Sequence, residues 1–147
     1  MTKQIPIGLD DFKEIIEKKY LYIDKSLLIK DITESGKVVL VTRPRRFGKT
    51  LNLSMLRYFY EKSEKSNSHL FEHLAIWQEP RYKLLQGQFP VIFITFKEIL
   101  SSTYEGMLQD FADRIAQEYK RHAYLLESSS VGEYEKQRFK RILSAQG

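Results

Sequence analysis

The stretch VVLVTRPRRFGKTLNLSMLRYFYE, residues 38–61, decides the expected fold. Val38–Val41 is a run of four aliphatic residues, which is typical of a strand buried on both faces of a sheet. A loop follows and ends in the tripeptide GKT. Apolar residues then recur at helical spacing from about Lys49 to Lys62, so we expect a helix there. A strand, a loop ending in GKT and a helix, in this order, indicate a phosphate-binding P-loop, also called a Walker A motif.

The residue types of this loop suit the binding of a nucleotide. Glycine at position 48 lets the backbone approach a phosphate, and the N–H groups at the start of the helix attract negative charge. Lys49 would reach the β- and γ-phosphates of ATP, and the hydroxyl of Thr50 would be a ligand of Mg²⁺. The expected nucleotide contacts are Arg45, Arg46, Phe47, Gly48, Lys49, Thr50 and Leu51. Arg45 and Arg46 could equally be solvated loop residues.

The positive charge of the chain is concentrated around the same loop. The sequence of 147 residues carries a net charge of +5. Residues 1–62 hold 13 basic and 8 acidic side chains, whereas residues 63–147 hold 11 of each. Between Glu34 and Glu61 there is no carboxylate but there are six basic residues, namely Lys37, Arg43, Arg45, Arg46, Lys49 and Arg57. Such a patch implies an anionic partner, most commonly phosphate.

The remaining pattern predicts a second strand and several helices. Phe89–Phe96 (FPVIFITF) is a second apolar run, which we interpret as another buried strand. Short helices are expected around Phe12–Ile16 and from an N-cap at Asp24 to about Ser35. Longer helices are expected within Ile99–Leu126 and at Val131–Leu143. No apolar run approaches the roughly 20 residues of a membrane span, so we expect a cytoplasmic protein without a membrane partner.

Three blocks of the sequence resemble the N-terminal part of the AAA-ATPase-like family. They are IPIGLDDFKEIIEKKYLYIDKSLLIKDI, VVLVTRPRRFGKTLNLSMLRYFYE and FPVIFITFKEI. In that family RPRRFGK[ST] is the usual P-loop form, so Arg43 in place of the common glycine fits the resemblance. The resemblance implies an α/β fold, namely a P-loop ATPase of three layers, with ATP and Mg²⁺ as cofactors. Family members usually carry a PD-(D/E)XK nuclease-like domain after the ATPase core.

The resemblance also implies that part of the ATPase core is missing. Hydrolysis needs an apolar strand that ends in Asp to hold Mg²⁺ (the Walker B strand). The strand at Phe89–Phe96 is followed by Lys97-Glu98 instead, and the family's Asp strand lies beyond the point that corresponds to Gly147. We therefore expect an incomplete sheet in a single partial domain, without a second domain and with little hydrolysis. Its parts would be a helical segment (1–36), a P-loop unit (37–62), and the second strand with helices (63–147). Self-association or a partner segment would complete the sheet.

Other interpretations remain beside ATP binding. The basic loop and a C-terminal basic run could contact nucleic acid, as a nuclease-associated module would, or the chain could be a decayed remnant that binds nothing. The segment YLYIDK at residues 20–25 could lie over an adenine base or pack in the core. His69 and His73 are spaced like two metal ligands on a helix, but no third ligand is evident, so surface histidines are the simpler interpretation.

Overall fold

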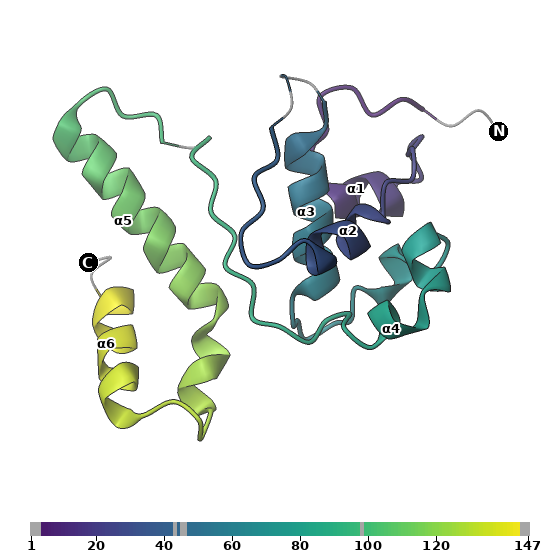
Figure 1. The fold of residues 1–147 in the computed structure, drawn as a ribbon. Helices are drawn as coiled ribbons and strands as arrows, with labels where there is room; N and C mark the ends of the chain where they lie inside the picture. The colour runs from purple at the N-terminus through teal and green to yellow at the C-terminus, as the bar shows by residue number, and fades with distance from the viewer. Residues whose placement is uncertain (1–3, 43, 45–46, 98, 145–147) are drawn as a thin grey trace. The chain divides into compact units, whose positions relative to one another are not determined.

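The computed structural model describes residues 4–42, 44, 47–97 and 99–144. These residues form two compact units, one that ends at Val91 and one that begins at Ile92. The first unit contains the helices α1 (Phe12–Glu17), α2 (Leu28–Glu34), α3 (Lys49–Tyr60) and α4 (Pro80–Lys83), together with two 3₁₀-helices, η1 (Ser68–Leu70) and η2 (Ala75–Gln78) (Figure 1). The second contains α5 (Tyr104–Arg121), the 3₁₀-helix η3 (Ala123–Glu127) and α6 (Glu133–Ser144).

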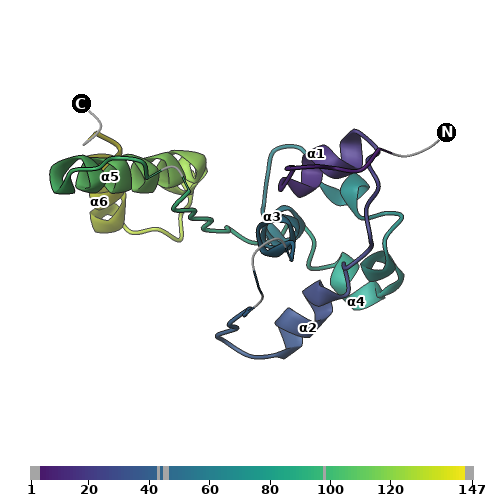
Figure 2. The ribbon, with the colours of Figure 1, turned by 90° about the horizontal axis from the view of Figure 1, so that it is seen from above.

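Helix α3 is the centre of the first unit, and α1 lies beside it in both ribbon views (Figures 1 and 2). Met55 and Phe59 of α3 are completely buried, as is Phe12 of α1. Phe71 packs on both aromatic rings, with its centroid 5.1 Å from that of Phe12 and 5.1 Å from that of Phe59. Ile29 of α2, Ile76 of η2 and Tyr82 of α4 complete the same cluster. One apolar core therefore joins all the helical segments of this unit.

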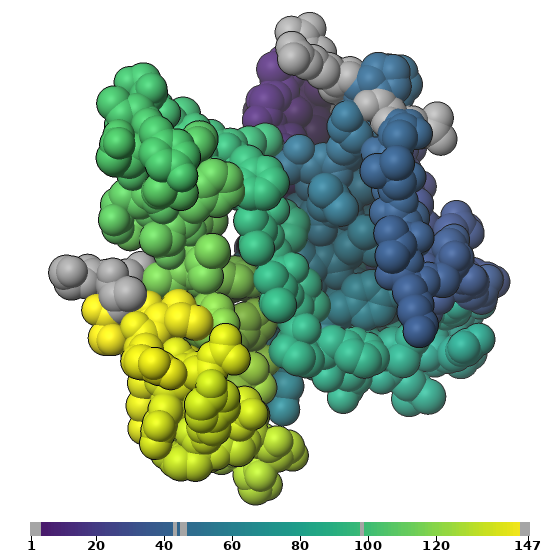
Figure 3. All heavy atoms as spheres, turned by 60° about the vertical axis from the view of Figure 1, so that its left-hand side comes forward, coloured from purple at the N-terminus to yellow at the C-terminus, as the bar shows by residue number. Residues whose placement is uncertain are grey.

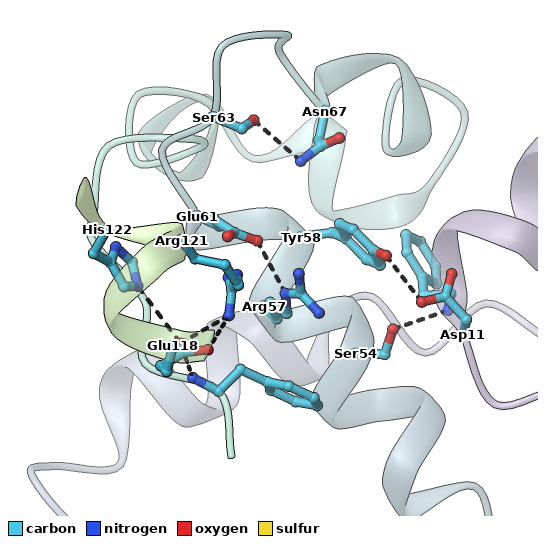
Figure 4. Close-up of polar contacts among 12 residues, drawn as sticks. Asp11, Ser54, Arg57, Tyr58, Glu61, Ser63, Asn67, Glu118, Arg121 and His122 are labelled. Atoms are coloured by element: carbon cyan, nitrogen blue, oxygen red, sulfur yellow. Dashed lines mark hydrogen bonds and ion pairs between the residues drawn. The ribbon is translucent and has the colours of Figure 1, made fainter. Parts of the chain in front are cut away.

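Hydrogen bonds hold the start of α1 against α3. Asp11 caps α1 by accepting a hydrogen bond from the N–H of Glu14 at 2.9 Å, and it accepts a second from the hydroxyl of Tyr58 at 2.9 Å (Figure 4). The hydroxyl of Ser54 accepts a hydrogen bond from the N–H of Phe12 at 3.0 Å. Burial, together with the bond to Asp11, raises the pKa of Tyr58 to about 12, so its hydroxyl keeps its proton.

The second unit is a pair of helices, α5 and α6, that pack side by side (Figure 1). Thr103 caps α5 by accepting a hydrogen bond from the N–H of Gly106 at 3.1 Å. The rings of Tyr119 and Phe139 meet at a centroid distance of 4.7 Å. The nearly buried carboxylate of Glu118 accepts hydrogen bonds from the N–H of Phe93 at 2.8 Å and from Arg121, so the start of this unit is tied to α5 (Figure 4).

The expected α/β fold is wrong. Within the described ranges no strand is formed, and the one bridge of β type joins Glu61 to Phe89. Val38–Val41 is not a buried strand: Val38 is 90% exposed and Leu40 84%. The second apolar run is not one either, because Ile92 is 74% exposed and Phe96 65%. A helix satisfies its own backbone hydrogen bonds, whereas a strand needs a partner from elsewhere in the chain, so an apolar run alone does not specify a sheet.

Most of the expected helices are present, with changed bounds. Helix α3 begins at Lys49 as expected and ends at Tyr60. The carbonyls of Phe59 and Tyr60 in its last turn accept hydrogen bonds from the N–H groups of Gly87 and Phe89. Its apolar side packs on α1 and the core cluster rather than on a sheet. Helix α2 begins at Leu28, after a turn, so the expected N-cap at Asp24 is also wrong. Helix α5 covers the middle of the range Ile99–Leu126.

Candidate functional site

The start of α3 has the backbone geometry that a glycine provides. Gly48 is the N-cap of α3 with φ of +73°, in the left-handed region that other residues rarely adopt. Its carbonyl accepts the hydrogen bond from the N–H of Asn52 at 2.9 Å, which closes the first turn. The N–H groups of that turn have no carbonyl partner within the helix, as at every helix start, so they present partial positive charge.

A cavity of about 510 Å³ lies beside this helix start. Two segments of the first unit form its wall. The segment around the start of α2 contributes Lys25, Leu27, Leu28 and Asp31, and the segment through the start of α3 contributes Val41, Phe47, Lys49 and Asn52. Lys25 and Lys49 are both exposed at this wall. With two ammonium groups and one carboxylate, the described part of the wall carries a net positive charge.

The cavity includes some of the expected nucleotide contacts and not others. Phe47 and Lys49 line it, and Gly48 lies between them at the helix start. Thr50, the expected Mg²⁺ ligand, is half-buried in the first turn of α3 and is not among the lining residues. Leu51 packs against the apolar core. The remaining two expected contacts, Arg45 and Arg46, lie outside the described residues.

Lys25 reaches the cavity because the residues on both sides of it are anchored. Asp24 accepts hydrogen bonds from the N–H of Ser26 at 2.8 Å and from the N–H of Ala75 at 2.7 Å. The buried hydroxyl of Ser26 accepts another from the N–H of Ile76 at 3.0 Å. Partial burial of Asp24 opposes its ionisation, but the hydrogen bonds from Ser26 and Ala75 outweigh this and lower its pKa. We call these three contacts the Asp24–Ser26 clamp; they join the segment before α2 to the start of η2.

The clamp gives the YLYIDK segment a structural role. Tyr22 packs edge-on against Phe12, and its hydroxyl donates a hydrogen bond to the sulfur of Met55 at 3.3 Å. Burial raises the pKa of Tyr22 to about 12. Tyr22 lines a different cavity from the one beside Lys49, so its position favours packing over contact with a base at the helix start.

Asp31 and Asn52 are lining residues that the sequence did not indicate, whereas Lys25 was indicated as part of YLYIDK, but for contact with a base rather than for a place beside Lys49. Asn52 had a usable signal, since it lies three residues after Lys49 and therefore on the same side of the helix. Lys25 and Asp31 had no signal for a position beside Lys49, because both are more than 15 residues away from it in the chain. Their proximity to it depends on how α2 packs on the core, which periodicity does not reveal.

His69 and His73 lie at the cavity that Tyr22 lines, which has a volume of about 710 Å³. His69 and His73 line it together with Glu17, and the Nε2 atom of His69 is 3.3 Å from the carboxylate of Glu17. Among the residues that the structure describes, no group of three or more His, Cys, Asp or Glu side chains could hold a metal ion.

The donor set at the start of α3 suits phosphate better than a protein-held metal. Lysine ammonium groups and helix N–H groups are donors for phosphate oxygens. For Mg²⁺ the described lining offers one carboxylate, that of Asp31, which is too few protein ligands to hold the ion without further oxygen ligands.

No described helix is both long enough and apolar enough to span a membrane. No solved structure matches the chain. A protein of Azotobacter chroococcum mcd 1, named "Uncharacterized protein in vnfD 5'region", is 34% identical over 98 residues. The matched part is 64% of this chain and 17% of that protein, so the chain spans less than a fifth of the relative it matches. A family model described as "AAA-ATPase_like: Predicted AAA-ATPase" matches residues 6–146, and the chain therefore belongs to this predicted AAA-ATPase family.

Proposed function

We propose that this chain binds ATP, together with its Mg²⁺, in the cavity beside the start of α3. One observation carries the proposal: Lys25 and Lys49 line the same cavity. This cavity lies at the start of α3, where Gly48 is the N-cap and has a left-handed backbone conformation. Each component favours phosphate by itself, and both lysines lie within residues 6–146, which match the model of an ATPase-like family.

The cavity also provides an apolar surface near its charged end. Leu27, Leu28, Val41 and Phe47 line it along with the polar residues, and Phe47 is 58% exposed. We propose that these side chains contact the base or the ribose, since ligand sites commonly combine an apolar lining with a few polar groups. A volume of about 510 Å³ lies within the range of small-molecule sites.

We propose binding with little hydrolysis as the property of this chain by itself. Asp31 is the one carboxylate among the described lining residues of the cavity, and it lies in the first turn of α2.

Isothermal titration calorimetry with Mg-ATP tests the proposal. We expect saturable binding by the 147-residue chain and a loss of roughly 10- to 100-fold in affinity for Lys49→Ala, because a charge-assisted hydrogen bond contributes about 1.5–3 kcal/mol. Lys65→Ala is a matched control, since Lys65 is also an exposed lysine of the first unit but does not line the cavity.

Two results would contradict ATP binding. One is the absence of heat and of saturation at millimolar Mg-ATP. The other is equal affinity of the Lys49→Ala and Lys65→Ala variants, which would mean that Lys49 contributes no more to binding than a lysine outside the cavity. Fluorescence anisotropy with a short DNA across a salt series separates the nucleic-acid alternative, since binding to a phosphate backbone weakens steeply with salt.

A further inference from the structure

We propose that Lys25 is a second residue that contacts the phosphates of the bound nucleotide, from the wall of the cavity formed by α2 and the turn before it. This inference rests on the proposed function and extends it, because the P-loop motif contains no residue of this segment. Lys25 and Lys49 are separated by 24 positions in the sequence but line the same cavity.

The backbone of Lys25 is held in place before any ligand arrives. Asp24 and Ser26, its two neighbours, form the clamp with the N–H groups of Ala75 and Ile76. Ser26 is completely buried, and the N–H of Lys25 itself is 3.4 Å from the hydroxyl oxygen of Tyr22, to which it donates. The side chain of Lys25 is nevertheless exposed. A fixed backbone with an exposed ammonium lowers the ordering cost of a contact with the ligand.

Lys25 supplies a large share of the positive charge that the described lining residues give to the cavity. Among the described lining residues, Lys25 and Lys49 are the basic ones and Asp31 is the acidic one. Removal of either lysine leaves the described charged side chains of this wall with no net charge. The contribution of Lys25 therefore increases with the number of phosphates on the ligand, since the attraction of an ammonium increases with the charge that it faces. A contact with the base or the ribose would contribute equally to ATP and AMP.

The test compares three variants of the full 147-residue chain, Lys25→Gln, Lys25→Arg and Lys65→Gln, with three ligands, Mg-ATP, Mg-ADP and AMP, by isothermal titration calorimetry. Lys25→Gln and Lys65→Gln remove the same charge, so the second controls for net charge. We expect Lys25→Gln to weaken Mg-ATP binding roughly 5- to 30-fold and AMP binding less than threefold, whereas Lys65→Gln changes neither by more than about twofold. Lys25→Arg should keep most of the affinity, because it keeps the charge.

Each result decides the proposal. If Lys25→Gln binds Mg-ATP like Lys65→Gln while Lys49→Ala has lost affinity, Lys25 makes no phosphate contact and the proposed function stands. An equal loss for Mg-ATP and AMP overturns a contact with the β- and γ-phosphates and assigns Lys25 to the part that the two ligands share. If the unaltered chain binds none of the three ligands, the proposed function fails, and this inference fails with it. Circular dichroism of each variant shows whether the helices persist, so a folding defect is not mistaken for a lost contact.

Discussion

Helix α3 and the segment Val38–Val41 belong to one short stretch of sequence and are both apolar, but their surroundings differ completely. Met55 and Phe59 of α3 are fully buried against α1 and the 3₁₀ segments. Val38 and Leu40 are almost fully exposed, and the extended segment belongs to the surface of the molecule (Figure 3). Apolar residues therefore stabilise this fold only where other residues cover them, and the candidate site lies at the junction between these two regions.

The buried side of α3 is the place where a substitution should have the largest effect. Phe59 contacts Phe71 and Tyr60 through edge-on rings and is 0% exposed. Truncation in Phe59→Ala removes this burial and leaves a cavity, so the free energy of unfolding should fall by roughly 3–5 kcal/mol. Urea denaturation followed by circular dichroism measures the loss.

Leu53→Ala is the matched control on the same helix, because Leu53 is 49% exposed. It should cost less than about 1 kcal/mol, since little burial is lost. If the two variants were equally stable, α3 would not pack as the core cluster requires.

The Asp24–Ser26 clamp should contribute the next largest effect. Asp24→Ala leaves the N–H groups of Ser26 and Ala75 without their acceptor. We expect a loss of about 1–2 kcal/mol, at the lower end for a charged acceptor because the carboxylate is partly exposed to solvent. The variant should also weaken Mg-ATP binding, since the clamp holds Lys25.

The pH dependence of stability offers a second measure of the clamp. The pKa of Asp24 is lower in the folded chain than its usual value, so its stabilising contribution is fully present above the unfolded pKa of about 3.9. This contribution is lost as the pH falls through the folded pKa. Asp24→Ala should therefore be less stable than the unaltered chain at pH 6, and the difference should shrink below about pH 4. A constant difference would show that the ionised carboxylate is not what matters.

Gly48 lies between the exposed segment Val38–Val41 and α3, as the N-cap of that helix. Among the described residues other than its chain neighbours, none has an atom within 4 Å of a Cβ added at this position, so the expected cost of Gly48→Ala comes from the left-handed backbone. That cost is about 1–2 kcal/mol, partly offset by the lower entropy of the unfolded chain, so we expect a net loss near 1 kcal/mol. Gly48→Asn should cost less, because asparagine tolerates this region better. Thermal melts of the two variants would contradict the geometry if Ala were the better replacement.

Local patterns in the sequence predicted the helices well and the sheet wrongly. The start of α3 at Lys49 follows from the glycine before it and from apolar spacing, which act within a few residues. The strands that were expected at 38–41 and 89–96 would need to pair with distant segments. The apolar content of a segment carries no information about whether such a partner is present. The candidate site divides in the same way. Lys49 and Phe47 are visible in the motif, whereas Lys25 and Asp31 reach it through the packing of α2.

The exposed segment provides the smallest predicted effect and the strictest test of the corrected fold. Leu40 is 84% exposed, so Leu40→Ser removes almost no burial, and the free energy of unfolding should change by less than about 0.5 kcal/mol. The same substitution in a strand buried on both faces would cost about 2–4 kcal/mol through lost burial and an unsatisfied hydroxyl. Urea denaturation of Leu40→Ser beside Phe59→Ala therefore distinguishes the two arrangements directly. A large loss for Leu40→Ser would show that the segment is covered in solution, and the contrast between it and α3 would then be wrong.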